Sequence, residues 1–337
     1  MPWWLHASAW PFPVKPRRAC LVGIALLSLS LLIGCARSPR RVVAVPIADL
    51  RAMPGTFAQP QTHDALQETQ LLYGETVRLI RTEGDWAFVE AVDQLEYTHA
   101  FRWQGYPGWM PKAFLQEAGG PRPNAVIGVK WATVWRDAGG TEAWLMLPMG
   151  SPVRVETTTG EFWKLSLASE TEGWILRGQV ELLTELARLP EAQRRDRIVR
   201  AAQQLLGDPY FWGGRSPHFG GPALANVTGV DCSGLVNLAY QAAGIRVPRD
   251  AHEQFLRART VAHPQAADLV FLSDPANPHK IVHVLLVAGE ESLIEGPGTG
   301  LAVRRIDAAT RLGRPLAALS SGESVGNQQV FFGTYFR

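Results

Sequence analysis

Cysteine is scarce in this sequence, with three residues in 337, at positions 20, 35 and 232. An excess of one charge is also missing: the net charge is +2, and no basic helix or aromatic–basic ladder favours nucleic acid as a partner. The sequence has no His-Glu-x-x-His or paired-cysteine signature, so we expect no metal and no other cofactor. With 46% hydrophobic and 19% charged residues, the chain is long enough for two or three globular domains.

The N-terminal segment has the features of an export signal. Basic residues precede the apolar run 19–33, which is short for a membrane-spanning helix, and a small residue follows it. The end of the run, Leu32-Ile33-Gly34-Cys35, resembles a bacterial lipobox. The resemblance implies a signal peptide over 1–34 and lipid on Cys35. Because Ala36 follows, it also implies an anchor on the periplasmic side of the outer membrane. An ordinary signal or an anchor helix is the alternative.

Two regions of short β segments follow the N-terminal segment, and their sequences look alike. Gly74, Val77, Trp86 and Gly108-Trp109 in the first region recur at similar spacing as Gly150, Val153, Trp163 and Gly173-Trp174 in the second. This spacing resembles tandem bacterial SH3-like barrels. We expect the tryptophans to be core residues, and Tyr106, in a turn, to be the exposed aromatic residue. A groove that binds wall peptide or glycan is the alternative for the tryptophans.

The C-terminal region alternates helix with strand. A helical stripe begins near Pro190 and ends at Gly207, and its charged stretch 191–197 is expected to face solvent. Strands are predicted at 268–272, 282–287, 293–295 and 330–336. The sequence thus predicts a signal peptide (1–34), a tether (35–41), β domains over 42–118 and 124–184, and an α+β domain over 185–337.

Cys232 occupies a position that favours chemistry. It lies in Asp231-Cys232-Ser233-Gly234, before apolar residues at helical spacing from Leu235 to Ala243. The first turn of a buried helix lowers the pKa of a thiol, and its N–H groups can hold an oxyanion. If Cys20 leaves with the signal and Cys35 carries lipid, Cys232 is the only mature thiol, which also indicates reactivity. The alternative is a small core residue.

Among the eight histidines, His283 is the best candidate for the base, because it lies in an apolar strand where a polar side chain needs a reason. The next predicted strand returns beside it, so Glu295, twelve positions later, can face the imidazole. A carboxylate there would orient the ring and favour its protonated form. A structural His283 and a surface Glu295 are the alternatives, and His252 and His279 compete as bases.

These motifs, in this order, resemble the NlpC/P60 family of cysteine peptidases. The resemblance rests on Tyr210-Phe211-Trp212-Gly213-Gly214, Asp231-Cys232-Ser233-Gly234, Val247-Pro248-Arg249-Asp250, Asp268-Leu269-Val270-Phe271, His283-Val284 and Glu295. It covers residues from about 190 to 337 and implies a papain-like α+β domain. Together with the barrels and the lipobox, it implies a multidomain enzyme that cleaves peptidoglycan stem peptides at the γ-D-glutamyl–diamino-acid bond.

The resemblance also implies a role for each matching residue. Cys232 would be the nucleophile, His283 the base and Glu295 the third catalytic residue. Tyr210, Asp231 and Ser233 would line the substrate cleft, Asp250 would bind the free amino group of an N-terminal L-alanine, and Glu75 and Tyr106 of the first barrel would close that end.

The sequence departs from the family pattern at two places. The third catalytic position is most often His and is Glu here, and the segment 215–230 is longer than the family turn, which indicates an inserted loop near the cleft. Two other functions stay open: an inactive wall-binding lipoprotein, and a cysteine-dependent amidase or transferase on another acyl donor. We expect a monomer.

Overall fold

The structure is a computed structural model that describes residues 39–55, 64–168, 171–221 and 227–337. The predicted signal peptide, the lipidation site Cys35 and the tether up to residue 38 lie outside the described residues. β1 begins at Arg40, so the end of the predicted tether is already a strand. Within the described ranges, no helix combines the length and apolar character needed to cross a membrane.

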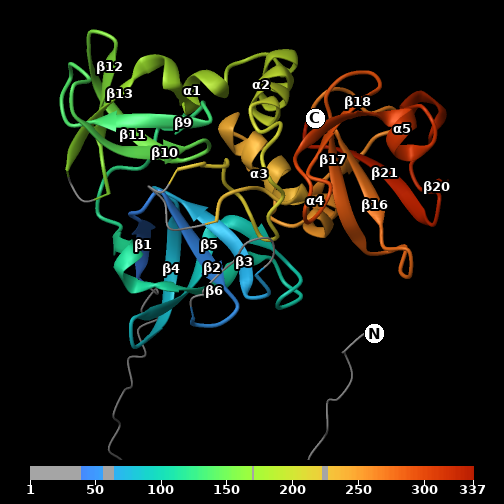
Figure 1. Cartoon of the computed structure of the whole chain (residues 1–337), viewed down its shortest axis with the longest axis horizontal. Helices are drawn as coiled ribbons and strands as arrows, with labels where there is room; N and C mark the ends of the chain where they lie inside the picture. Colours follow the sequence, from blue (N-terminus) through green and yellow to red (C-terminus); the bar gives the residue numbers. More distant parts are fainter. Residues whose placement is uncertain (1–38, 56–63, 169–170, 222–226) are drawn as a thin grey trace, which may run out of the picture. The chain divides into compact units, whose positions relative to one another are not determined.

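Three antiparallel sheets follow one another along the chain (Figure 1). The first contains β1 (Arg40–Val43), β2 (Ile47–Arg51), β3 (Gln67–Leu72), β4 (Thr76–Glu83), β5 (Trp86–Glu96), β6 (Gln104–Pro111) and β7 (Leu115–Glu117). The second contains β8 (Ala125–Ile127), β9 (Trp131–Trp135), β10 (Ala143–Pro148), β11 (Pro152–Thr159), β12 (Phe162–Ser166), β13 (Glu172–Leu176) and β14 (Val180–Leu182). The third contains β15 (Arg259–Thr260), β16 (Leu269–Ser273), β17 (Ile281–Val287), β18 (Ser292–Glu295), β19 (Arg304–Asp307), β20 (Ser324–Val325) and β21 (Gln328–Thr334).

The first two sheets have the same topology. The strand order is β3-β2-β6-β5-β4-β1-β7 in the first and β10-β9-β13-β12-β11-β8-β14 in the second, which is the same order shifted by seven strands. A short 3-10 segment, η1 (Lys112–Phe114) or η2 (Arg177–Gln179), precedes the last strand of each. The two regions of similar sequence spacing therefore share a fold, and their assignment as SH3-like barrels stays a prediction.

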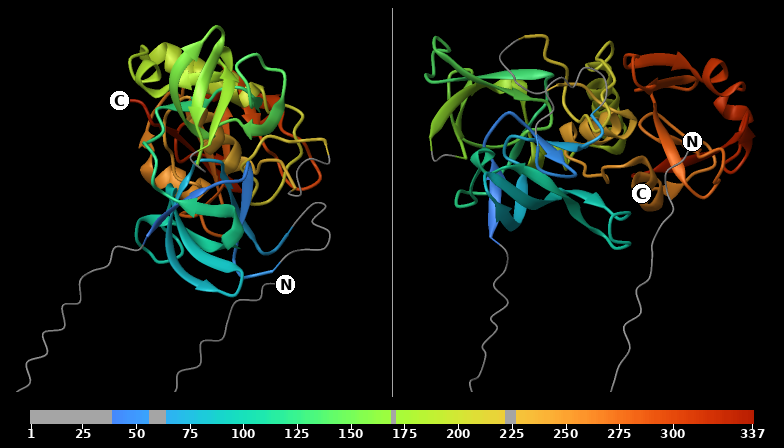
Figure 2. Two further views of the ribbon diagram at one scale, coloured as in Figure 1. Left: turned by 90° about the vertical axis from the view of Figure 1, so that its left-hand side faces the viewer. Right: turned by 60° about the horizontal axis from the view of Figure 1, so that its bottom comes forward.

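The third sheet is covered on both faces, which explains its nearly continuous apolar strands. The helices are α1 (Leu183–Leu186), α2 (Glu191–Gln203), α3 (Cys232–Ala242), α4 (Ala251–Arg257) and α5 (Ala308–Leu312), with η3 (Leu316–Ala318) after α5. Alternate residues such as Val284 and Leu286 join the core around α3, whereas Leu285 and Val287 join the core around α5. Figure 2 shows the third sheet, in orange and red, in two further views. The strands predicted from sequence in this region all occur, with ends shifted by a few residues.

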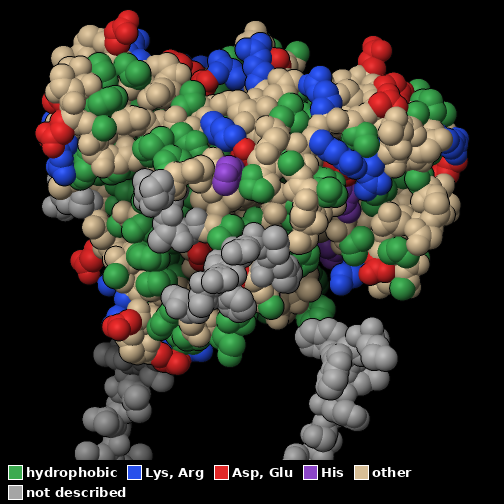
Figure 3. All heavy atoms as spheres, viewed as in Figure 1, with side chains coloured by type: hydrophobic (Ala, Val, Ile, Leu, Met, Phe, Trp, Pro, Cys, Tyr) green, Lys and Arg blue, Asp and Glu red, His purple; other side chains and the backbone are tan. Residues whose placement is uncertain are grey.

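Two expectations about exposure are wrong in detail. On α2, the charged stretch faces solvent except for Arg195, which is buried and donates to Asp268 at 2.7 Å; Lys and Arg side chains otherwise gather over this helix (Figure 3). Of the repeated tryptophans, Trp109 is buried, but Trp86, Trp163 and Trp174 are only half-buried. A strand has two faces, and sequence spacing does not say which one is covered.

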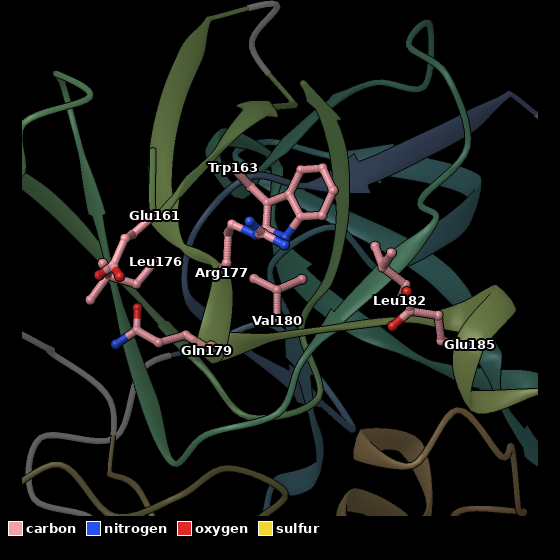
Figure 4. A pocket seen from close by; sticks show the side chains of 9 residues that line it. Glu161, Trp163, Leu176, Arg177, Gln179, Val180, Leu182 and Glu185 are labelled. Atoms are coloured by element: carbon pink, nitrogen blue, oxygen red, sulfur yellow. The ribbon is translucent and has the colours of Figure 1, made fainter. Parts of the chain in front are cut away.

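Trp163 lies on an uncovered face of the second sheet. It lines an open cavity of about 640 Å³, whose other lining residues include Arg177, Val180 and Leu182 (Figure 4). The Arg177 guanidinium lies 5.7 Å from the centre of the Trp163 ring, close enough for a cation–π contact. Two carboxylates, Glu161 and Glu185, also line this cavity, but among the described residues no cysteine or histidine does, so it lacks the thiol and imidazole predicted for the catalytic site.

Two equivalent glycines mark the contacts between the successive parts of the chain. Gly74 and Gly150 both have a left-handed φ, +82° and +83°, which glycine adopts without strain. A Cβ on Gly74 would lie 2.1 Å from the carbonyl oxygen of Pro152 in the second sheet, and one on Gly150 would lie 2.8 Å from Leu238 of α3. Backbone therefore packs directly against the next part of the chain at both positions.

A buried ion pair also joins the first sheet to the C-terminal region. Arg215, in the segment predicted to be an insertion, donates to Glu75 at 2.8 Å, and both side chains are at most 1% exposed. Gln241 of α3 donates to the same carboxylate, and Gln70 of β3 donates to the carbonyl of Val227. The described part of the predicted insertion therefore packs between the first sheet and α3.

We expect Arg215→Met to destabilise the protein strongly, because it leaves the Glu75 carboxylate buried without its cation. The free energy of unfolding should fall by about 3–5 kcal/mol, measured by chemical denaturation. Arg200→Met is the matched control: its ion pair with Asp196 is exposed, and the expected loss is below about 1 kcal/mol. The double variant Glu75→Leu/Arg215→Met should lose less than Arg215→Met alone. Equal losses for Arg215→Met and the Arg200→Met control would contradict this.

Candidate active site

Cys232 begins α3, as predicted, and is the free cysteine among the described residues. Asp231 caps the helix: its Oδ1 accepts from the backbone N–H of Gly234 at 2.6 Å. Cys232 is 8% exposed. The sulfur is thus held in the first turn of a buried helix, beside N–H groups that have no partner within the helix.

His283 and Glu295 lie together on neighbouring strands. The β17–β18 hairpin pairs Leu286 with Ile294, and the Nε2 atom of His283 lies 2.9 Å from Oε2 of Glu295. Because Nε2 faces the carboxylate, Nδ1 is the ring nitrogen left for Cys232, which is in hydrogen-bonding range of the imidazole. The contact between His283 and Glu295 that we predicted from the hairpin is therefore present.

The pKa of His283 is raised to about 9. Burial lowers it, but the negative charge and hydrogen bond of Cys232, and then those of Glu295, more than offset this effect. The imidazole therefore carries a proton at neutral pH. An imidazolium beside a cysteine is the pairing found in enzymes with a cysteine nucleophile.

Glu295 is not a surface carboxylate, since its side chain is completely buried. Burial raises its pKa, yet the hydrogen bonds from His283 and Arg304, together with the charge of Arg311, lower the pKa to about 2. The two arginines were not predicted. The sequence offered only their positive charge as a signal, because both reach Glu295 from elements later in the chain.

Asp231 and Ser233 are predicted to flank the substrate, but their side chains form hydrogen bonds within the protein. Asp231 accepts from Arg249 at 2.8 Å, and Ser233 accepts from the same guanidinium at 3.0 Å. Arg249 is fully buried and lies 3.6 Å from Asp250. Tyr210 lies near the nucleophile: burial raises the pKa of its hydroxyl, and the charges of Asp231 and Cys232 raise it further.

The first sheet contributes to a second cluster around Asp250. The hydroxyl of Tyr106 donates to Asp250 at 3.0 Å and lies 3.4 Å from Glu68. His99 stands between Glu68 and Glu96, and hydrogen bonds to these two carboxylates raise its pKa to about 10. Three carboxylates, one phenol and one imidazolium thus meet where the first sheet contacts the loop before α4.

Asp250 remains accessible to solvent, with 38% of its side chain exposed. The surrounding protein nevertheless desolvates it, and together with nearby negative charge this raises its pKa to about 7, even though Arg249 lowers it. A carboxyl group in this state gains from pairing with a cation. The cluster is therefore suited to an ammonium group.

Two predictions about the first sheet need correction. Tyr106 is buried, with an exposed fraction of 4%, because it packs across the contact with Asp250. It lies in β6 and not in a turn. Glu75 does not reach Asp250, since Arg215 and Gln241 hold its carboxylate in the buried contact described above. The acidic residue beside Tyr106 is Glu68, which stands seven positions before Glu75 in the sequence.

The competing histidines lack a catalytic arrangement. His252 is half-buried, and its Nδ1 accepts from the backbone N–H of Ile281 at 3.2 Å. Burial lowers its pKa, so it is neutral near pH 7. His279 is exposed in a loop. Of the candidate bases, His283 is the one with both a thiol and an orienting carboxylate.

The arrangement is suited to acyl transfer. A thiolate at a helix N-terminus can attack a carbonyl, the N–H groups of the first turn can stabilise the resulting oxyanion, and an imidazolium can donate a proton to the leaving group. The carboxylate on the far side of the ring fixes which nitrogen faces the sulfur.

Comparison with known proteins agrees with this arrangement. Over 237 residues, the chain is 25% identical to the gamma-D-glutamyl-L-lysine dipeptidyl-peptidase of Bacillus cereus, covering 68% of this chain and 67% of that protein. It is 26% identical to the enzyme of the same name from Bacillus subtilis, covering 71% and 75%. The crystal structure of an NlpC/P60 family protein from Bacillus cereus has the same fold, with a TM-score of 0.69, 20% identity, and coverage of 88% of this chain and 99% of that one. Residues 207–313, which include Cys232, His283 and Glu295, match the model of the NlpC/P60 family, so this part of the chain is identified as an NlpC/P60 domain.

Proposed function

We propose that the protein hydrolyses cell-wall peptides at the bond between γ-D-glutamate and a diamino acid, in stem peptides that begin with a free L-alanine. The observation that carries the proposal is the distance of 2.9 Å between His283 and Glu295, behind a thiol at the start of α3. Further support comes from the relatives, two of which are named gamma-D-glutamyl-L-lysine dipeptidyl-peptidases.

In the proposed reaction, the thiolate of Cys232 attacks the γ-glutamyl carbonyl and forms a tetrahedral oxyanion beside the first turn of α3. His283 gives its proton to the nitrogen of the diamino acid, the C–N bond breaks, and an acyl-enzyme remains on Cys232. A water molecule then gives its proton to His283 and attacks the thioester. The released acid is the dipeptide L-Ala-D-Glu, and the thiolate–imidazolium pair is restored.

The end of the substrate is proposed to be read by the cluster at Asp250. The ammonium group of L-alanine would lie against Asp250, with Tyr106 and Glu68 of the first sheet beside it, whereas Glu75 is not part of this proposal. A desolvated ammonium group requires a carboxylate partner. Asp231, Ser233 and Tyr210 would shape the cleft at the nucleophile.

A cell-wall substrate requires an exported enzyme. The N-terminal sequence supports a secretory signal, and we propose lipid attachment at Cys35 and action as a monomer on the periplasmic side of the outer membrane. The diamino acid is proposed to be lysine or diaminopimelate.

The direct test is incubation with L-Ala-γ-D-Glu-meso-diaminopimelate and its L-lysine counterpart, followed by mass spectrometry. We expect release of L-Ala-D-Glu from at least one of them. The isomer linked through the α-carboxyl of D-Glu is the matched control and should react at least about 100-fold more slowly, because its carbonyl is displaced from the sulfur. No dipeptide from a protein whose Cys232 still reacts with a thiol probe would indicate another acyl donor. An unreactive thiol would favour a wall-binding lipoprotein.

A further inference from the structure

The carboxylate of Glu295 is completely buried, and more than one cationic side chain contacts it. Besides His283, two arginines donate to it: Arg304 from β19 and Arg311 from α5. A buried carboxylate that only had to orient one imidazole would not need two guanidinium groups. The hydrogen bonds that each arginine makes with the two carboxylate oxygens indicate how it affects the His283–Glu295 contact.

Arg304 holds one oxygen of the carboxylate. It stands opposite Glu295 in the β18–β19 register, and its Nε and Nη2 atoms donate to Oε1 at 3.0 and 2.7 Å. Oε1 is the oxygen that faces away from His283. These two hydrogen bonds from one rigid guanidinium hold Oε1 in place, which leaves Oε2 for the imidazole.

Arg311 bridges the two oxygens. Its Nε lies 3.0 Å from Oε2, which also contacts His283, and 3.2 Å from Oε1. Strand alternation explains the contact: Leu285 and Leu293 face the core around α5, and His283 and Glu295 are each two residues away on the same strands. The short helix α5 thus packs behind the base and its carboxylate.

We propose that Arg304 and Arg311 are positioning residues that clamp the Glu295 carboxylate toward His283 and offset its charge, so that the imidazolium can release its proton to the leaving group. The inference rests on the proposed function for the identity of that leaving group. We call Arg304, Arg311 and Glu295 the arginine clamp.

The two arginines weaken the hold of Glu295 on the proton of His283. The charged or titratable groups around the imidazole are Glu295, Arg304 and Arg311 behind it and Cys232 in front, with Asp231 and Tyr210 beside the sulfur. An unclamped glutamate would stabilise the imidazolium more strongly and raise the pKa of His283 above about 9. A stronger hold on the proton would make His283 a weaker acid toward the leaving amine.

The test is the pH dependence of Cys232 alkylation by iodoacetamide in the full chain, with label on the Cys232 peptide quantified by mass spectrometry. The rate changes near pH 9 when the imidazolium loses its proton. In Arg304→Gln and Arg311→Gln, this transition should move up by about one pH unit, because one neighbouring cation is gone. Cleavage of the γ-linked tripeptide should show a kcat at pH 7 about tenfold lower.

Arg305→Gln is the matched control, because Arg305 follows Arg304 on the same strand and makes none of the Glu295 contacts described above. Its transition and its kcat should equal those of the wild type. Arg304→Lys keeps the charge but loses the bidentate hydrogen bond, so the transition should stay near pH 9 while kcat falls. This variant also tests the positioning role if a glutamine variant does not fold.

Three outcomes would overturn the clamp: an unmoved transition in both glutamine variants, a transition that moves equally in Arg305→Gln, or an unchanged kcat in Arg304→Lys. A lower thermal midpoint without a shifted transition would make the arginines merely structural. Alkylation needs no peptide, so the clamp and the proposed function fail separately. A shifted transition without any dipeptide from the wild type would refute only the function.

Discussion

Cys232→Ala should reduce the release of L-Ala-D-Glu by roughly 10⁴-fold or more, to the background of the assay. The side chain that it removes supplies the bond-forming atom, and neither the imidazole nor the helix N-terminus can replace it. The fold should survive, because the change removes one small, nearly buried atom group from the first turn of α3. Kinetics and the thermal midpoint are measured on the same preparation.

Cys232→Ser sharpens the comparison. It keeps a hydroxyl nucleophile of similar size, but a serine hydroxyl is not ionised by an adjacent imidazolium, so the activity should also fall to near background. Trapping of the wild type during turnover should give an acyl adduct of L-Ala-D-Glu on the Cys232 peptide. Activity within tenfold of wild type in either variant would show that another residue is the nucleophile.

Asp250→Ala should lower kcat/KM for the tripeptide with a free amino group by about 10²–10³-fold, because a desolvated ammonium group would lose its carboxylate partner. The N-acetylated tripeptide is the matched substrate. It lacks the ammonium, so the wild type should cleave it poorly and Asp250→Ala should change that low rate by less than about threefold. Both substrates are compared by initial rates at pH 7.5.

The pH dependence provides an independent reading of the same site. Because the pKa of Asp250 is raised to about 7, the carboxyl is neutral below that pH and cannot pair with an ammonium group. For the wild type, kcat/KM for the free-amine peptide should therefore rise as the pH rises through about 7. Asp250→Asn should lose this limb, and Asp196→Asn, an exposed change on α2, should keep it. An unchanged preference for the free amine in Asp250→Ala would refute the amino-group site.

Much of the catalytic centre is predictable because its signals are local. The spacing of the apolar residues after Cys232 predicts the helix that holds it. The His283–Glu295 contact follows from a hairpin in which the two residues are only twelve positions apart. In both cases the sequence neighbours are also the spatial neighbours, so alternation and helical spacing suffice.

The remainder depends on packing between segments far apart in the sequence. Glu68 and Glu75 are both acidic and stand seven positions apart, and only the docked C-terminal region decides which one meets Asp250 and which one is buried with Arg215. Tyr106 is buried for the same reason. Local sequence patterns likewise do not predict contacts from later elements. Arg311 on α5 reaches Glu295 only when the third sheet is complete.

The contact between Tyr106 and Asp250 has a consequence for the time at which activity appears. These residues are separated by 144 positions, and Asp250 precedes α4 near the end of the chain. Domains generally fold from the N-terminus during synthesis, so the first sheet would form early, and the thiol and its base would come together last. If the proposed function holds, a nascent or partly exported chain has no complete substrate site. Such a chain would lack peptidase activity until its C-terminal region has been made and has folded against the first sheet.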